Sequence, residues 1–338
     1  MHVRHVVVTG AAGFAGHHLV EHLLRTTDWK ITGLVSFRHR GCPRRLAHLH
    51  PDERLRILYA DLKAPLTSRT VDEIGQTGHV DVIFNVGAES HVDRSISDPV
   101  PFVENNTSLA LTMLEYARAA KPKVFLQIST DEVYGPAPDG YAHKEWDPVL
   151  PSNPYAASKA AQEAIAISYW RTYGVPVVIT NTMNLIGERQ DTEKFVPMVI
   201  SKVLRGEEIV IHGTPERIGS RFYLHARNHA DALKFLATRP PALYADTSTS
   251  QIARPDRYHV VGEREVDNFT MAKRIAEILD KPLRHRFEDF HATRPGHDRR
   301  YALDGGKLLA TGWAPPVPLD ESLARAVRWT LAHPEWTR

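Results

Sequence analysis

The sequence predicts an α/β protein: a doubly wound parallel sheet followed by a smaller mixed α/β carboxyl-terminal domain. Two observations carry this prediction. Short apolar runs alternate with amphipathic helical patterns from residue 6 to about residue 179. After about residue 194 this alternation weakens, and short strands mix with helices. We therefore expect a first domain over residues 1–193, to which later segments return, and a second over residues 194–338 that binds the substrate.

The composition is that of an ordinary soluble globular protein. The 338 residues are 42% hydrophobic and 24% charged, with a net charge of +2. This charge gives no reason to expect a nucleic-acid or membrane partner. Cys42 is the only cysteine, so no internal disulfide can form. The first residues lack a signal-peptide pattern, and no apolar run approaches the roughly 20 residues of a membrane span. We expect a cytoplasmic protein without a bound metal.

The amino-terminal segment predicts a dinucleotide site. Val6, Val7 and Val8 form an apolar run typical of a buried strand, and a helix with an apolar face follows within ten residues. Glycines separate the two in a GxxGxxG pattern. A strand, a glycine turn and a helix start together expose backbone N–H groups that bind a pyrophosphate. The sequence thus predicts a Rossmann-type domain, with cofactor contacts from Gly10, Gly13, Phe14, Ala15 and Gly16.

The end of the second strand bears on the choice of dinucleotide. This strand covers residues 31–35 and lacks the acidic residue that would hold a ribose diol. Ser36, Arg38 and Arg40 follow instead. A hydroxyl and two guanidinium groups suit a ribose 2′-phosphate, so NADP is slightly favoured over NAD. A solvated basic loop is the alternative reading.

The remaining elements follow in order along the chain. Further strands are expected at 55–59, 82–86, 124–128, 177–179, 209–213 and 258–262. Asn106 is expected to open a helix that ends near residue 117. A final amphipathic helix is expected over residues 319–331, with Leu323, Val327 and Leu331 facing the core and Pro334 ending it.

The fifth strand and the helix after it carry the candidate catalytic residues. Thr130, Asp131 and Glu132 follow the strand directly, at the edge where ligands bind to an open α/β sheet. Tyr155 and Lys159 stand four residues apart, so they share one face of a helix. An ammonium beside a phenol favours the phenolate, and two adjacent carboxyls can serve as acid and base. Alone, each pair is more typical of a solvated pair or a helix cap.

These motifs together resemble the extended short-chain dehydrogenase/reductases and, within them, the nucleotide-sugar 4,6-dehydratases. The resemblance spans roughly residues 4–331 and includes the runs 87–95 and 294–301. It implies that the catalytic residues are Thr130, Asp131, Glu132, Tyr155 and Lys159. It implies that the dinucleotide is also contacted by Asp61, Leu62, Gly87, Ala88, Tyr155 and Lys159. It implies that the substrate is bound by Glu89, Ser90, His91, Asn184, Arg221, Arg294 and His297.

The same resemblance implies an activity. A 4,6-dehydratase oxidises C4 of a nucleotide-diphosphate hexose, removes water between C5 and C6, and returns the hydride to C6, while NAD(P) stays tightly bound and is recycled. A homodimer is the family expectation. A C4-epimerase or a 5,6-dehydratase on the same scaffold is the nearer alternative, and a non-catalytic NAD(P)-binding sensor is the distant one. The chain departs from the family at residues 185–188 and beside Arg221.

Overall fold

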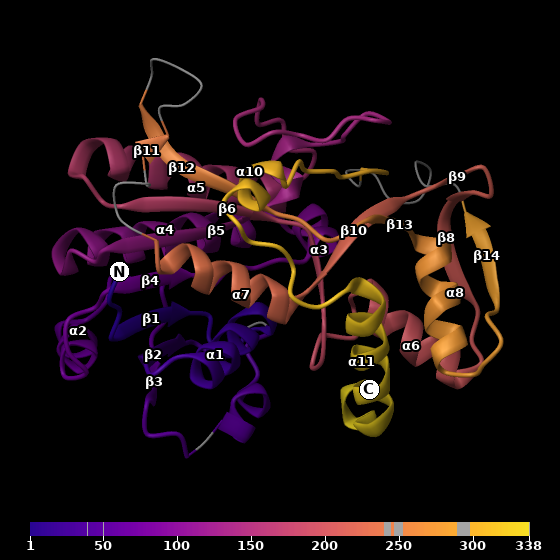
Figure 1. Ribbon diagram of the computed structural model, residues 1–338, viewed down its shortest axis with the longest axis horizontal. Helices are drawn as coiled ribbons and strands as arrows, with labels where there is room; N and C mark the ends of the chain where they lie inside the picture. Colours follow the sequence, from indigo (N-terminus) through magenta and orange to yellow (C-terminus); the bar gives the residue numbers. More distant parts are fainter. Residues whose placement is uncertain (39, 50, 240–244, 247–252, 289–297, 338) are drawn as a thin grey trace.

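Seven parallel strands form the centre of the molecule (Figure 1). The computed structural model describes residues 1–38, 40–49, 51–239, 245–246, 253–288 and 298–337. The main sheet has the order β11-β12-β6-β5-β4-β1-β2-β3, and β11 joins its edge antiparallel to β12. Its strands are β1 (His5–Thr9), β2 (Lys30–Val35), β3 (Leu55–Tyr59), β4 (Val82–Asn85), β5 (Val124–Thr130), β6 (Val177–Thr182), β11 (Ala245–Asp246) and β12 (Arg254–Val260).

Helices cover both faces of this sheet because its central strands are apolar on both sides. In β1, Val6 and Val8 enter one hydrophobic core and Val7 enters the other. The first core lies under α1 and α7, and the second lies under α2, α4 and α5. These helices are α1 (Phe14–Thr26), α2 (Ser68–Gly75), α4 (Pro99–Ala120), α5 (Pro154–Tyr173) and α7 (Ala226–Ala237).

A smaller group of elements forms the other end of the molecule (Figure 1). Two three-stranded sheets, β13-β10-β7 and β14-β8-β9, pack with three helices around a core of their own. The strands are β7 (Asn184–Ile186), β8 (Ile209–Thr214), β9 (Arg217–Ile218), β10 (Ser220–His225), β13 (Glu265–Asp267) and β14 (His285–Glu288). The helices are α6 (Phe195–Arg205), α8 (Asn268–Ile278) and α11 (Leu319–Ala332).

Later segments return to the main sheet. Strand β12 pairs in parallel with β6, α7 packs on α1, and α10 (Gly306–Ala310) packs on β12. The division at residue 193 remains a prediction. Short elements complete the chain: η1 (Pro43–Arg45), η2 (Ala47–Leu49), α3 (Val92–Ser97), η3 (Asp131–Tyr134) and η5 (Pro334–Trp336). No helix in the described ranges is long and apolar enough to cross a membrane.

Two helix predictions need correction. Helix α4 begins at Pro99, not at Asn106, because a proline at the first helical position needs no N–H partner there. Asn106 is instead fully buried inside the helix, where its side chain bonds Glu89 and Ser158. In α11, Leu323 and Val327 are buried as predicted, whereas Leu331 is 52% exposed.

Candidate active site

The turn between β1 and α1 leaves room for a close approach because its glycines lack side chains. Gly10 has φ +63°, and a Cβ there would lie 2.7 Å from the Gly87 Cα. A Cβ on Gly16 would lie 2.1 Å from the Gly10 carbonyl oxygen. Gly13 is the N-cap of α1 and offers no side-chain cap. The backbone N–H groups of this helix start therefore fit a pyrophosphate.

One cleft at the carboxyl ends of the strands gathers the predicted residues. Every residue predicted to contact the dinucleotide lines it: Gly10, Gly13, Phe14, Ala15, Gly16, Ser36, Arg38, Asp61, Leu62, Gly87, Ala88, Tyr155 and Lys159. The same cleft is lined by Thr130, Asp131, Glu132, Glu89, Ser90 and Asn184. The topology explains this convergence, because parallel strands end at the same edge of the sheet. The residue types present fit NAD(P).

The two arginines at the expected ribose end already have carboxylate partners. Arg38 forms an ion pair with Asp61 within the cleft. Arg40 pairs with Glu193 at 2.5 Å, which joins the loop after β2 to the segment before α6. The basic character that favoured a 2′-phosphate is thus neutralised locally, so the sequence-based preference for NADP is not supported.

Tyr155 and Lys159 lie on one buried face of α5, but their contacts differ from the expectation. The Lys159 Nζ donates to the Ile128 carbonyl at 2.7 Å and to Gln162 Oε1 at 2.6 Å. Burial lowers the pKa of Lys159 to about 8, and the charge of Glu163 opposes this shift. The pKa of Tyr155 is raised by burial and by the nearby carboxyls, whereas its hydrogen bond with Thr130 lowers it. The expected effect of Lys159 on this pKa stays a prediction.

Asp131 and Glu132 start the short helix η3, directly after β5. Burial and the neighbouring charge of Glu132 raise the pKa of Asp131 to about 7, although a hydrogen bond from Thr130 opposes this. That bond joins Thr130 Oγ1 to Asp131 Oδ1 at 2.9 Å. Burial also raises the pKa of Glu132. Two adjacent carboxyls with raised pKa values can act as general acid and general base.

Two residues that contact Glu132 were not predicted from the sequence. Asn153 caps α5 through its side-chain oxygen, and its Nδ2 donates to Glu132 Oε2 at 3.1 Å. The Tyr301 hydroxyl donates to the same oxygen at 3.4 Å. The Ser-Asn-Pro run before Tyr155 is a helix-start signal that could have identified Asn153. The position of Tyr301 depends on long-range packing, for which the sequence holds no local signal.

The predicted substrate residues divide into three groups. Glu89, Ser90 and Asn184 line the cleft. His91 instead caps α3 and lies 3.6 Å from Glu193, and Arg221 donates to the carbonyls of Asp298 and Arg299 while stacking on Tyr301. His91 and Arg221 are therefore not part of the cleft wall, although Arg221 lowers the pKa of both Asp131 and Glu132. Arg294 and His297 lie outside the described residues.

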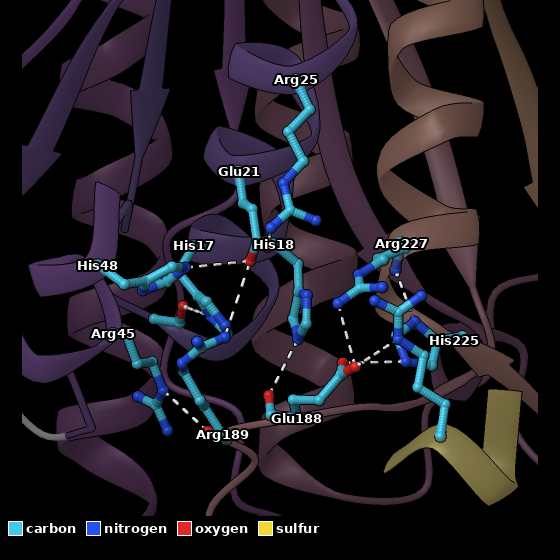
Figure 2. A network of polar contacts seen from close by, with 12 residues as sticks. His17, His18, Glu21, Arg25, Arg45, His48, Glu188, Arg189, His225 and Arg227 are labelled. Atoms are coloured by element: carbon cyan, nitrogen blue, oxygen red, sulfur yellow. Dashed lines mark hydrogen bonds and ion pairs between the residues drawn. The ribbon is translucent and has the colours of Figure 1, made fainter. Parts of the chain in front are cut away.

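Glu188, where the sequence departs from the family pattern, has a structural role away from the cleft. Figure 2 shows this carboxylate among Arg227, His225 and a network of further polar side chains. It lies 3.1 Å from Arg227, 3.0 Å from Arg325 and 3.2 Å from His225. Burial alone would raise the pKa of Glu188, but His225 and Arg227 lower it well below its usual range. Glu188 thus joins α7 and α11.

Figure 2 also draws His17, His18 and Glu21, three side chains of the types that ligate metal ions. One atom from each of His17, His18 and Glu21 lies within 4.8 Å of the others. The Glu21 carboxylate is, however, 2.7 Å from Arg25 and 3.7 Å from Arg189. Guanidinium groups so close to the carboxylate repel a divalent cation, so this cluster does not favour a metal.

The fold and the cleft define a Rossmann-type dinucleotide-binding protein with a Tyr-Lys pair and an Asp-Glu pair facing one cavity. The chain belongs to the NAD dependent epimerase/dehydratase family, whose model matches residues 6–246.

Individual relatives agree over nearly the full length. The chain is 32% identical to dTDP-glucose 4,6-dehydratase of Salmonella typhimurium, over 98% of this chain and 94% of that protein. It is 34% identical to the low-salt glycan biosynthesis protein Agl12 of Haloferax volcanii, over 98% and 99%. The crystal structure of a dTDP-glucose 4,6-dehydratase from Streptomyces venezuelae with NAD bound matches with a TM-score of 0.84, 32% identity and 98% coverage of both chains. A UDP-glucose 4-epimerase from Thermus thermophilus matches with a TM-score of 0.82, 25% identity and coverage of 96% and 98%.

Proposed function

We propose that this protein is a nucleotide-sugar 4,6-dehydratase that converts a nucleotide-diphosphate hexose to its 4-keto-6-deoxy form. One observation carries the proposal: Asp131 and Glu132 line the same cleft as Tyr155 and Lys159. A C4-epimerase oxidises and reduces one carbon, so it needs no acid–base pair for water removal. The 4,6-dehydratases among the similar proteins support the same choice.

The proposed roles follow from the positions of the side chains. When bound, the dinucleotide supplies a hydride acceptor for C4 and the hydride donor for C6. Tyr155 takes the proton of the C4 hydroxyl, supported by Thr130 and Lys159. Glu132 takes the C5 proton, which the 4-ketone has acidified, and Asp131 protonates the C6 hydroxyl so that it leaves as water. A pKa near 7 suits Asp131 to the role of acid at neutral pH.

A double variant tests these roles. We expect Asp131→Asn with Glu132→Gln to lower the rate of water loss by at least about 100-fold, because general acid and general base catalysis are both removed. Binding of the nucleotide sugar, measured by calorimetry, should change little, since both substitutions keep the side-chain shape. Normal turnover by this variant would refute the assignment of Asp131 and Glu132.

We propose NAD as the dinucleotide. Arg38 and Arg40 are engaged by Asp61 and Glu193, and the solved relatives from Streptomyces venezuelae and Thermus thermophilus contain NAD. Mass spectrometry of the dinucleotide released from the purified protein distinguishes NAD from NADP. The cytoplasmic localisation expected from the single cysteine stays a prediction.

We also propose a homodimer through α4 and α5. These helices pack side by side, and α4 exposes Val100 by 60%, Val103 by 41% and Leu111 by 45%. The spacing of these three residues puts them on one face of the helix. Exposed apolar side chains gathered on one helix face are typical of a subunit interface.

A further inference from the structure

An ion pair lies buried behind the cleft, where no role in the reaction has been assigned to it. Glu163 on α5 and Arg257 on β12 are each 2% exposed, and Glu163 Oε2 lies 2.7 Å from Arg257 Nη2. Neither residue lines the cleft. Burying two charges carries a large desolvation cost, so an ion pair of this kind adds little stability over an apolar pair of the same shape. Its contacts indicate what else it does.

The first set of contacts leads to the end of β5. The Asn181 amide on β6 donates through Nδ2 to Glu163 Oε1 at 2.7 Å and to the Thr130 carbonyl oxygen at 3.0 Å. Asn181 is fully buried, so no water competes for these bonds. Glu163 therefore fixes the orientation of the amide that holds Thr130, the residue directly before Asp131.

The second set of contacts leads to the other end of the same turn. Arg257 Nη1 donates to the Tyr134 hydroxyl oxygen at 2.9 Å. Tyr134 is the last residue of η3 and is 1% exposed. Its hydroxyl also lies 2.8 Å from His259 Nε2 and donates to the Glu145 carbonyl at 3.0 Å. Arg257 thereby holds the turn at its far end.

We propose that Glu163 and Arg257 are positioning residues for the elimination step: the pair holds both ends of the turn that carries Asp131 and Glu132. This inference rests on the proposed dehydratase function. Acid–base catalysis depends on placing each carboxyl within hydrogen-bond reach of its proton. Removal of the C4 hydride and of the C4-hydroxyl proton depends mainly on Tyr155, whose backbone is set by α5 and not by the turn. Loosening the turn should therefore slow water loss more than C4 oxidation.

The test follows oxidation and elimination separately in the intact protein. The nucleotide sugar that the wild type dehydrates is mixed with each variant, and the absorbance of reduced nicotinamide is recorded beside the release of product. We expect Arg257→Gln to lose at least tenfold in the rate of water loss while reduced dinucleotide still forms. Reduced dinucleotide should then accumulate in the steady state, which does not happen when folding alone is impaired.

Two further variants keep the test decisive. The double variant Glu163→Gln with Arg257→Gln removes both charges, so no unpaired buried charge is left to destabilise the fold. Reduced dinucleotide should accumulate in this variant as well. Lys307→Met is the matched control, because it breaks the 2.6 Å ion pair with Asp256 on the same strand β12. The control should keep the wild-type ratio of the two rates.

Two patterns of rates overturn the proposal. An equal loss of oxidation and elimination in Arg257→Gln and in the double variant would mean that the pair only stabilises the fold. Unchanged rates would mean that the turn is held without it. Failure of the wild type to release water from any nucleotide-diphosphate hexose would instead refute the proposed function, and so identifies a different error.

Discussion

At the scale of single residues, the site depends on how two neighbouring carboxyls differ. Asp131 is 4% exposed and receives a bond from Thr130, whereas Glu132 is partly buried and accepts bonds from Asn153 and Tyr301. The same backbone turn thus gives the two carboxyls different exposure and different hydrogen-bond partners. Such a difference is what lets adjacent acids take different protonation states.

The raised pKa of Asp131 predicts a pH dependence of stability. Asp131 titrates near its ordinary 3.8 in the unfolded chain and near 7 in the folded one, so the folded state binds the extra proton between these values. The stability it contributes is complete below pH 3.8 and is lost as the pH rises through 7. Relative to Asp131→Asn, the wild type should lose about 1.4 kcal/mol of unfolding free energy per pH unit between pH 4 and 7.

Urea unfolding at constant ionic strength, followed by circular dichroism across this pH range, measures that difference. A difference between wild type and Asp131→Asn that stays constant from pH 4 to 7 would contradict the raised pKa.

The sequence predicted that Tyr155 and Lys159 share one helix face, but not all of their contacts. Helical spacing alone put Tyr155 and Lys159 on one face of α5. Gln162 lies three residues after Lys159 on the same helix, so the same spacing makes these two residues neighbours. The other acceptor of Lys159, the Ile128 carbonyl, could not be predicted in this way. Ile128 belongs to β5, and which carbonyl meets an ammonium depends on how a helix packs on a strand. The effect of Lys159 on the pKa of Tyr155 stays a prediction.

At the scale of elements, the glycine turn between β1 and α1 is the most constrained feature. Its spacing was readable because close backbone approach requires glycine at fixed positions. The start of α4 was misread because Pro99 was not used as a helix-start signal. Leu331 was misplaced because helical periodicity gives a face but not the residue at which a helix leaves the core.

A pair of glycine variants tests the role of that turn. Gly16→Ala should lower the dinucleotide content of the purified protein below about a tenth of wild type, because its Cβ would meet the Gly10 carbonyl at 2.1 Å. Gly75→Ala is the matched control: its Cβ meets nothing within 4 Å at the end of α2. The released dinucleotide is quantified by absorbance. Wild-type content in Gly16→Ala would show that the close approach at this turn is not needed for binding.

At the scale of the whole molecule, residues far apart in sequence join the two ends of the structure. Glu188, just after β7, contacts Arg227 on α7 (Figure 2). It also contacts Arg325 on α11. The overall fold could be predicted because strand–helix alternation and the family motifs span the chain. The role of Glu188 could not be predicted, because its partners lie 39 and 137 residues away, and only folding brings them together.

The proposed dimer is a prediction at the same scale. Leu111→Glu should convert the protein from dimer to monomer at equal concentration, because it places a charge in an apolar interface on α4. Leu309→Glu is the control, since Leu309 is 61% exposed on α10, which packs against β12. Size-exclusion chromatography with light scattering measures both masses. A wild-type monomer, or a dimer that persists in Leu111→Glu, would exclude this interface.

Product analysis tests the central claim most directly. The purified protein is incubated with UDP-, dTDP-, CDP- and GDP-hexoses, and the products are followed by mass spectrometry and proton NMR. Because Asp131 and Glu132 share the cleft with Tyr155 and Lys159, we predict that one substrate loses the mass of water and gains a C6 methyl signal and a 4-ketone. A substrate that changes only its configuration at C4, with no loss of water, would contradict the dehydratase assignment and indicate an epimerase.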